Sequence, residues 1–323
     1  MFLLRSAPDT PVPDVPDSGD FRPRLACEDT TLDELLSRLL GTLTGRPYVF
    51  AFLAAFLVVA GMQLGWRRAV AFIPVGYAIA WASEKLSIST GFPYGWYHYR
   101  YDNLGNDLLV AGVPMFDSIS YVFLSYVGWS MAITLLGPLQ RRPAGPALDV
   151  RWTGDAAFRR RPGPIVLGAF LTMLMDVVVD PIAHKGDEWF LGQIYGYGRA
   201  EAPVHGEYFD ILLANFAGWF GVALLIIIAF ALVDRVLPRR GSEPVRHGDG
   251  GFAAGLAGAG LYYGILGFNL AVIIYVGTMR HQAGNADGAM TMVALLGCSV
   301  LWHAPFMVWL AVRVRRAPRV DAA

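Results

Sequence analysis

Long apolar blocks separated by short polar stretches dominate the amino-acid sequence. Most blocks are long enough to cross a bilayer as a helix, which takes about 20 residues. Backbone polar groups in lipid must be hydrogen-bonded, and no alternating pattern typical of a barrel strand is present, so we expect helices. The pattern predicts an all-α fold, a polytopic integral-membrane helix bundle with about seven transmembrane helices. The seven blocks are 47–65, 69–83, 108–137, 164–183, 211–233, 251–279 and 289–312.

The segments that flank these blocks differ from them in composition. Residues 1–30 are rich in proline and aspartate, which predicts a disordered N-terminal tail. Leucines at helical spacing over residues 31–46 predict an amphipathic helix that lies on the membrane surface. We therefore expect a transmembrane domain over residues 47–312, followed by a short basic cytoplasmic tail over 313–323.

Arginine and lysine are distributed unevenly between the two sides of the expected bundle. The loops after the first, third and fifth blocks, together with the C-terminal tail, hold 16 Lys and Arg residues. The loops after the second, fourth and sixth blocks hold 5. This bias follows the positive-inside rule. It predicts a multi-pass protein of the cytoplasmic membrane with the Arg-rich end inside.

Charge and cysteine content exclude several other classes of protein. The chain has 26 basic and 26 acidic residues among 323, so no basic excess is present to hold nucleic acid. Cys27 lies in the polar tail and Cys298 lies in an apolar block, which gives no disulfide framework. No histidine pair has metal-helix spacing, so we expect no metal site.

Polar side chains inside the apolar blocks or at their ends are the main candidates for function. Glu84, Asp117, Asp180 and Asn215 all fall near the end of the bundle that lies away from the Arg-rich loops, and Asp176 lies one turn deeper. Ionisable residues in a membrane span are costly and therefore suggest function. The loops at this end, 84–107 and 184–210, are rich in aromatic residues and glycine. We expect one polar pocket with an aromatic lid.

Asp176 and Asp180 form the sharpest feature of the sequence. Spacing of four residues puts both carboxyl groups on one helix face, about 5–6 Å apart at Cβ. Two carboxyl groups this close in an apolar environment do not both ionise cheaply, so one is expected to retain a proton and act as a general acid. The alternative is a structural role, with the carboxylates paired to Lys85, Lys185 or an arginine.

Several short motifs occur in a fixed order around these residues. They read Phe-Pro-Tyr-Gly-Trp-Tyr-His-Tyr at 92–99, Leu-Gly at 104–105, Gly-Val-Pro at 112–114, Met-Asp at 175–176 with Asp-Pro-Ile-Ala at 180–183, and Asn-Phe-Ala-Gly-Trp at 215–219. In order and spacing this series resembles the CruF-type carotenoid biosynthesis proteins, which are integral-membrane carotenoid 1,2-hydratases. The resemblance implies addition of water across the terminal C1=C2 double bond of an acyclic carotenoid.

The residues suit that chemistry, in which a proton adds to C2 and water attacks the tertiary cation at C1. The catalytic candidates are Asp176 and Asp180 as acid, with Glu84, Asp117 and Asn215 to hold the water and take its proton. The substrate-binding candidates are Tyr94, Trp96, Tyr97, His98, Tyr99 and Trp219. The reaction requires no cofactor. The expected partners are an acyclic carotenoid from the bilayer, water, membrane lipid and other enzymes of the pathway.

Three alternatives remain open from the sequence. Asp176 and Asp180 also fit a Mg²⁺–diphosphate site of an intramembrane prenyltransferase, although no second Asp-rich motif is found. Paired buried acids also serve proton-coupled transporters. A carotenoid-binding or assembly subunit without catalysis is the third alternative.

Overall fold

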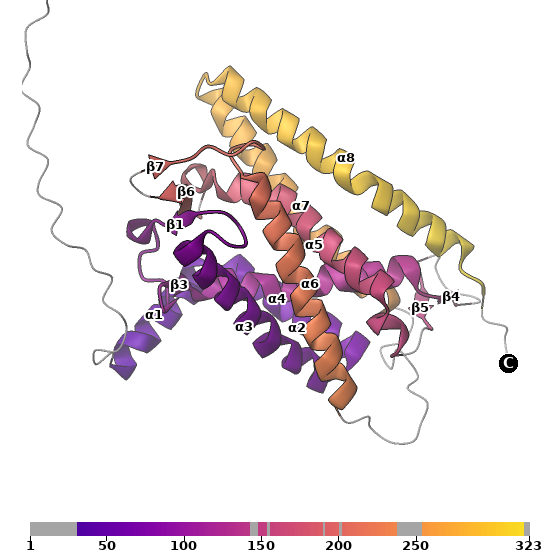
Figure 1. The fold of residues 1–323 in the computed structure, drawn as a ribbon. Coiled ribbons are helices and arrows are strands. Elements are labelled where there is room, and N and C mark those ends of the chain that lie inside the picture. The colour runs from indigo at the N-terminus through magenta and orange to yellow at the C-terminus, as the bar shows by residue number, and fades with distance from the viewer. Residues whose placement is uncertain are drawn as a thin grey trace, which may run out of the picture.

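The computed structural model describes residues 31–142, 148–153, 156–189, 191–199, 202–237 and 254–319. Helices dominate this part of the chain, as predicted (Figure 1). They are α1 Leu32–Gly45, α2 Pro47–Leu64, α3 Trp66–Thr90, α4 Met115–Leu136, α5 Pro162–Ala183, α6 Leu213–Val236, α7 Ala254–Gln282 and α8 Ala286–Arg316. The predicted disordered tail, 1–30, lies outside the described residues.

Short strands lie at the two ends of the helices. At one end, three strands pair in the order β1, β6, β7, and β2 pairs with β3; at the other end, β4 pairs with β5 (Figure 1). The strands are β1 Tyr97–Tyr99, β2 Leu109–Val110, β3 Val113–Pro114, β4 Leu139–Arg141, β5 Val150–Trp152, β6 Tyr195–Arg199 and β7 Ala202–Pro203. Three single turns of 3-10 helix, η1 Tyr101–Asn103, η2 Phe158–Arg160 and η3 Gly186–Glu188, complete the elements.

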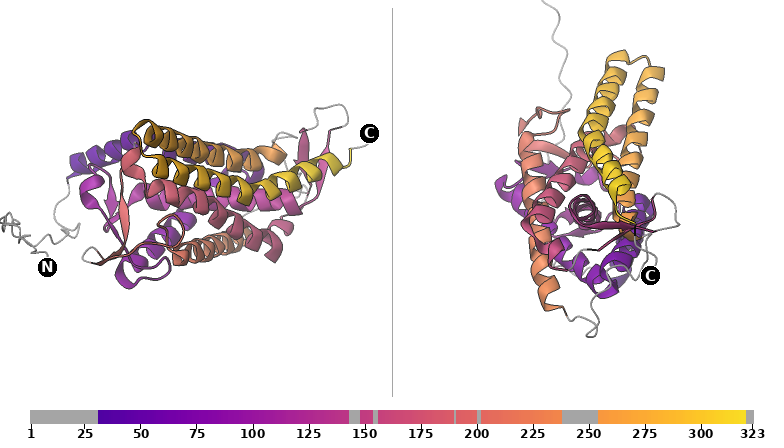
Figure 2. Two further views of the ribbon diagram at one scale, coloured as in Figure 1. Left: turned by 90° about the horizontal axis from the view of Figure 1, so that it is seen from above. Right: turned by 90° about the vertical axis from the view of Figure 1, so that its right-hand side faces the viewer.

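Helix α4 is the centre of the bundle and contacts each of the other long helices from α2 to α8. Seen from above, the long helices run lengthwise side by side (Figure 2). Two glycines allow α4 and α5 to approach closely. A Cβ atom on Gly128 would lie 2.3 Å from Thr172 Oγ1, and one on Gly168 would lie 2.7 Å from the Cα of Trp129. This packing brings together the two helices that carry Asp117 and Asp180.

Among the described residues, six helices are long and apolar enough to cross a membrane, namely α2, α4, α5, α6, α7 and α8. The chain is therefore a multi-pass membrane protein with the predicted all-α fold. The block 69–83 forms the middle of α3, which has 25 residues and lies beside α2, α4 and α6. The mean hydropathy of α3 is lower than that of the other six helices because it carries charged residues toward both ends, namely Arg67, Arg68, Glu84 and Lys85.

The block 108–137 was expected to be helical throughout, and its first part is not. Residues Leu109–Val110 and Val113–Pro114 form the β2–β3 hairpin, and α4 begins only at Met115. Gly112 at the turn has φ +85°, a conformation that favours glycine. The late start places Asp117 in the first turn of α4.

The predicted amphipathic segment forms α1, and its leucines at 32, 35, 36, 40 and 43 are exposed. The opposite side of α1 is attached to the loop before β2. Thr42 Oγ1 accepts a hydrogen bond from the backbone N–H of Leu108 at 2.7 Å. Arg46, at the junction with α2, forms a buried ion pair with Asp107 and donates to the carbonyl of Leu191. This arginine connects both loops of the predicted lid.

Candidate functional site

A pocket lies at the end of the bundle that carries β1 and β6. Four polar side chains line it, each from the end of a different helix: Glu84 from α3, Asp117 from α4, Asp180 from α5 and Asn215 from α6. The structure thus brings together the residues that the sequence placed at this end. The rest of the lining is aromatic: Tyr94, Tyr97, Tyr121, Tyr195, Tyr197 and Trp219.

Asn215 connects the two carboxyl groups of α5. Its Nδ2 atom donates to Asp176 Oδ2 at 3.0 Å and to Asp180 Oδ2 at 2.6 Å. Asp180 lines the pocket, whereas Asp176 lies behind it and is fully buried. A single amide nitrogen therefore holds two carboxyl groups close together, with one of them facing the cavity.

A second pair of carboxyl groups comes from α3 and α4. Glu84 Oε2 accepts a hydrogen bond from Ser118 Oγ at 2.6 Å, and Asp117 Oδ2 accepts one from Tyr99 at 2.7 Å. The other oxygen of Glu84 is buried and has no hydrogen-bond partner among the described residues. This Oε1 atom is available to accept a hydrogen bond from a molecule in the pocket.

Within the described part of the chain, no cation forms an ion pair with any of these four carboxyl groups. The two lysines that could have neutralised them bind elsewhere. Lys85 Nζ donates to the carbonyl of Ala111 at 2.9 Å, and Lys185 pairs with Asp210. The structural alternative for Asp176 and Asp180, a salt bridge to Lys85, Lys185 or an arginine, is thus not observed among these residues.

The aromatic lid is a two-stranded ladder made from the two loops. Strand β1 pairs with β6 so that Tyr97 lies opposite Tyr197 and Tyr99 opposite Tyr195. Side chains alternate between the faces of a strand, so all four rings lie on one face. The ring centroids of Tyr97 and Tyr195 are 6.2 Å apart, and those of Tyr195 and Tyr197 are 5.7 Å apart. These rings form an apolar wall over the carboxyl groups.

Burial controls the ionisation of the lid. It raises the pKa of Tyr97, Tyr195 and Tyr197 well above the ordinary value of 10, and the nearby carboxyl groups raise it further. These phenols therefore stay protonated and present hydroxyl donors to the pocket. His184 packs against the rings of Tyr195 and Tyr197, and burial lowers its pKa to about 4. The histidine is neutral at pH 7.

The inner wall of the pocket depends on two close contacts of α6, one with α4 and one with the loop after α3. Tyr121 and Trp219 stack with ring centroids 3.8 Å apart and planes at 7°. One turn from Asn215 and next to Trp219, Gly218 lies directly against this loop. A Cβ atom there would be 2.4 Å from Tyr94 Cδ1 and 2.9 Å from the carbonyl oxygen of Pro93. Glycine is thus needed for Asn215 and Trp219 to reach the pocket.

Three predicted substrate-binding residues do not line the pocket. Trp96 is 38% exposed and stacks under the guanidinium of Arg199. His98 points to the other face of β1, where its Nδ1 is 3.2 Å from the carbonyl oxygen of Gly198. Tyr99 belongs to the same face as the other three rings but is not among the residues that line the pocket, and its hydroxyl group donates to Asp117. Tyr94, Tyr97 and Trp219 do line it.

Sequence reasoning placed Tyr195 and Tyr197 in a loop of the expected lid, but it named neither of them, nor Tyr121, as a site residue. A signal was present for two of them, because Tyr-Gly-Tyr-Gly at residues 195–198 alternates with the period of a strand. Pairing this strand with Tyr97–Tyr99 places large rings on one face and glycine on the other. Tyr121 lies one turn after Asp117 on the same face of α4.

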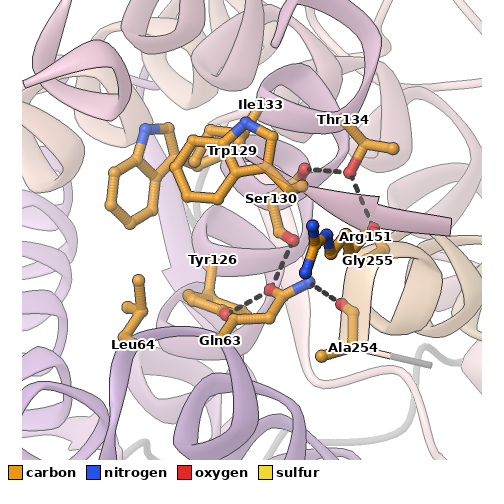
Figure 3. Close-up of a pocket in the computed structure, with 11 residues that line it drawn as sticks. Gln63, Leu64, Tyr126, Trp129, Ser130, Ile133, Thr134, Arg151, Ala254 and Gly255 are labelled. Carbon is orange, nitrogen blue, oxygen red and sulfur yellow. Dashed lines mark hydrogen bonds between the residues drawn. The ribbon is translucent and has the colours of Figure 1, made fainter. Parts of the chain in front are cut away.

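A second cavity lies toward the opposite end of the bundle (Figure 3). Gln63 is one of its lining residues, and its Oε1 atom accepts hydrogen bonds from Tyr126 at 2.6 Å and Ser130 at 2.7 Å. Its Nε2 atom donates to the carbonyl of Ala254. In contrast to the first pocket, none of the described residues that line this cavity is acidic.

Comparison with known proteins agrees with the motifs of the pocket. A model of the carotenoid biosynthesis protein family matches residues 44–247, more than half of the chain. That range includes every polar residue and every ring that lines the first pocket. Neither the curated proteins nor the solved structures contain a match to the chain. The chain belongs to the family of carotenoid biosynthesis proteins.

Proposed function

We propose that the protein hydrates the terminal C1=C2 double bond of an acyclic carotenoid end group. One observation carries the proposal: carboxyl groups without cationic partners in the described chain share a pocket with six aromatic rings. Protonation of an alkene needs a carboxylic acid away from bulk water, and the resulting cation needs π-rich walls. The family supports a carotenoid as the substrate.

Asp180 is the proposed acid because it faces the pocket and lies beside Asp176 on the same amide. Repulsion between the two carboxylates favours a state in which the pair retains one proton. Transfer of that proton to C2 breaks the π bond and leaves a tertiary cation at C1. The rings of Tyr121 and Trp219 are placed to stabilise it, each aromatic face contributing about 0.5–2 kcal/mol.

Glu84 is the proposed base. Its Oε1 atom is buried without a partner in the described chain, while Ser118 fixes the other oxygen. A water molecule held by this oxygen attacks C1, forms the C–O bond and gives its proton to Glu84. After the reaction the Asp176–Asp180 pair has lost one proton and Glu84 has gained one. Proton exchange with solvent restores the starting state of both. Asp117 and its partner Tyr99 hold the neighbouring wall.

The apolar bundle supports entry of the substrate from the bilayer, with only its end group in the pocket. We place the protein in the cytoplasmic membrane with its Arg-rich end inside, following the positive-inside rule. The pocket then lies at the opposite face.

Pigment analysis tests the proposal. The chain is expressed in a host that makes acyclic carotenoids, beside Asp180→Asn, Asp176→Asn and, as a control outside the pocket, Lys85→Gln. Liquid chromatography with mass spectrometry is expected to find a product heavier by one water per modified end, absent for both Asp variants and retained for Lys85→Gln. A prenylated product that disappears with EDTA would instead support the prenyltransferase alternative, and no new pigment from any acyclic substrate would refute the hydratase.

A further inference from the structure

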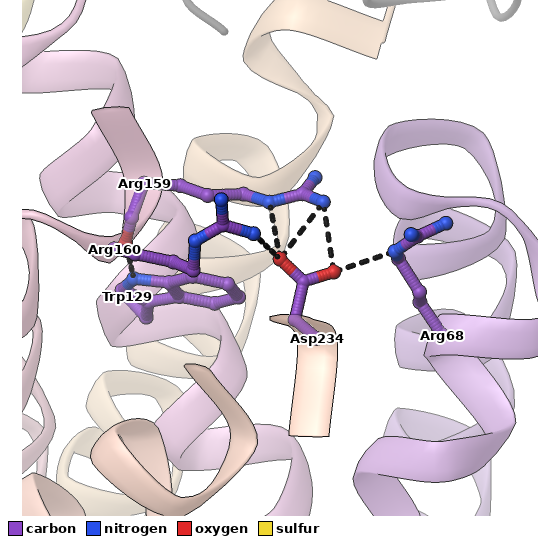
Figure 4. Close-up of polar contacts among 5 residues, drawn as sticks. All are labelled: Arg68, Trp129, Arg159, Arg160 and Asp234. Carbon is purple, nitrogen blue, oxygen red and sulfur yellow. Dashed lines mark hydrogen bonds and ion pairs between the residues drawn. The ribbon is translucent and has the colours of Figure 1, made fainter. Parts of the chain in front are cut away.

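A buried carboxylate at the opposite end of the bundle has an environment unlike that of the pocket. Asp234, in the last turn of α6, is contacted by three arginines from two other segments (Figure 4). Its carboxylate lies 3.0 Å from Arg159 Nη2, 3.0 Å from Arg160 Nη1 and 2.5 Å from Arg68 Nε. The guanidinium groups surround this single carboxylate.

This arginine cluster, defined as Arg68, Arg159 and Arg160 around Asp234, carries a surplus of two positive charges. The side chains of Asp234 and Arg159 are 1% and 5% exposed, and those of Arg160 and Arg68 are 13% and 18% exposed. Buried charge without a counter-ion is strongly unfavourable. No second carboxylate pairs with these arginines in the described part of the chain. The cluster therefore lacks an anion.

The cluster also has donors to offer to an anion. Among the described contacts, Arg68 uses only Nε and Arg160 only Nη1. A guanidinium carries five N–H donors in a planar fork, which suits the oxygens of a phosphate group. Exposed Arg67, Arg161 and Arg235 each adjoin a member of the cluster in sequence. They add exposed positive charge next to the cluster in the sequence.

The position of η2 is fixed by the core of the bundle. Trp129 Nε1 of α4 donates to the carbonyl of Arg159 at 3.1 Å, and the Trp129 ring packs against Phe230 of α6. The arginines are therefore held in place by structured elements and not by a free loop. Arg68 lies at the start of α3, Arg159 and Arg160 lie just before α5, and Asp234 lies at the end of α6, so the cluster is at one end of these helices.

We propose that the arginine cluster binds the phosphate group of an anionic phospholipid. The headgroup phosphate supplies the missing negative charge at the depth where the spans end. Basic pockets between helices on the cytoplasmic side suit such headgroups. The acyl chains extend along the bundle into the bilayer. This site is separate from the acid pocket and does not depend on the proposed reaction.

Lipid binding to the purified full chain tests the site. The protein in detergent is titrated with phosphatidylglycerol, with phosphatidylcholine and with inorganic phosphate, while retained lipid is followed by native mass spectrometry and thermal unfolding. Arg160→Gln is the main variant because Arg68 and Arg159 still neutralise Asp234 in it. Arg316→Gln is the matched control, since it removes an exposed charge from the last turn of α8.

Phosphatidylglycerol is expected to bind and raise the unfolding temperature, whereas phosphatidylcholine has no such effect. Arg160→Gln should weaken the binding about fivefold, the equivalent of about 1 kcal/mol for one arginine near the surface. Arg68→Gln should act similarly, and Arg316→Gln should have no effect. Equal binding in the cluster variants, or an equal loss in Arg316→Gln, would refute the site. An equal shift with inorganic phosphate would refute a lipid as the ligand.

Discussion

Asp176 and Asp234 are both aspartates, both are almost fully buried, and they lie toward opposite ends of one bundle. Asp234 is surrounded by three guanidinium groups, and Asp176 by a second carboxyl group and an amide. A buried carboxylate that is neutralised by arginines holds helices together and has a fixed charge. A buried carboxyl group without a cation is available for proton transfer. The groups that contact each carboxyl group, and not its burial, therefore distinguish an aspartate that stabilises the fold from one that is available for proton transfer.

The aromatic residues of the core and those of the pocket also differ. Between the ends, Phe56, Phe72 and Phe230 pack as core rings around Trp129. Around the pocket, five of the six rings are tyrosines, and the hydroxyl group of Tyr97 lies 3.4 Å from that of Tyr99, which donates to Asp117. Tyrosine combines an apolar face with a polar tip, which suits a wall that must contact both a hydrocarbon and a water molecule.

Removing the charge of Asp234 is expected to have the largest effect on folding. Asp234→Asn leaves three guanidinium groups without their carboxylate, and breaking a buried ion pair costs about 3–5 kcal/mol. Thermal unfolding in detergent should show a large drop in the midpoint. The matched Asp176→Asn should keep the wild-type midpoint, because an amide oxygen can still accept from Asn215. Equal drops for both variants would mean that the two ends do not differ.

Removing the proposed base is expected to lower the rate without affecting the fold. Glu84→Gln abolishes the proton acceptor, and the loss of a positioned acid or base costs about 100-fold or more in rate. Product formation in membranes measures this, with the protein level as a reference. Its sequence neighbour provides the control, since Lys85→Gln changes a residue that binds the carbonyl of Ala111 outside the pocket. A wild-type rate in Glu84→Gln would remove Glu84 from the mechanism.

Two glycines of α6 offer a matched pair of substitutions. Gly218→Ala forces a Cβ atom against Tyr94 and Pro93, which should destabilise the pocket end by about 1–3 kcal/mol and lower product formation. Gly221→Ala has open space and should leave the unfolding midpoint unchanged or raise it, because alanine favours a helix. Thermal unfolding and product formation together check both. Equal behaviour of the two variants would contradict the close contact at Gly218.

The smallest expected effect is a pH dependence of stability at the pocket end. The pKa of His184 is about 4 in the folded chain and 6.5 in the unfolded one, so the unfolded chain binds more protons between these values. Stability from this histidine is present above pH 6.5 and is lost as the pH falls toward 4. Unfolding midpoints measured between pH 7 and 4 should therefore fall less in His184→Gln. A midpoint that falls as much in His184→Gln as in the wild type would contradict this origin of the pH dependence.

The sequence predicted the bundle because lipid imposes one pattern on every span. Where hydropathy is the only signal, it is ambiguous: the apolar run before Met115 forms a hairpin, since a short apolar strand and an apolar helix turn have similar composition. The predicted block 69–83 is shorter than the helix that contains it. It was ended at Glu84 because a charged residue interrupts the apolar run, yet Glu84 is buried inside α3, which continues to Thr90.

Convergence of the pocket residues could be predicted because helix ends on one side of a bundle must meet. Which residues of the lid face inward could not, because that depends on the register between β1 and β6. His98 lies between two inward tyrosines and therefore faces outward. The bridge from Asn215 to both aspartates also needs the three-dimensional approach of α5 and α6. Chemical roles for these residues remain predictions.

Isotope labelling of the product decides whether the carboxyl groups hydrate a carotenoid. Membranes that contain the full chain, Asp180→Asn or Asp234→Asn are incubated with an acyclic carotenoid in water enriched in heavy oxygen or in deuterium. We expect the full chain to place the heavy oxygen in the new hydroxyl group and one deuterium on C2, and Asp180→Asn to place neither. Asp234→Asn, normalised to folded protein, should retain both labels. A hydroxyl oxygen that comes from dioxygen, or undiminished labelling in Asp180→Asn, would contradict acid-catalysed hydration in this pocket.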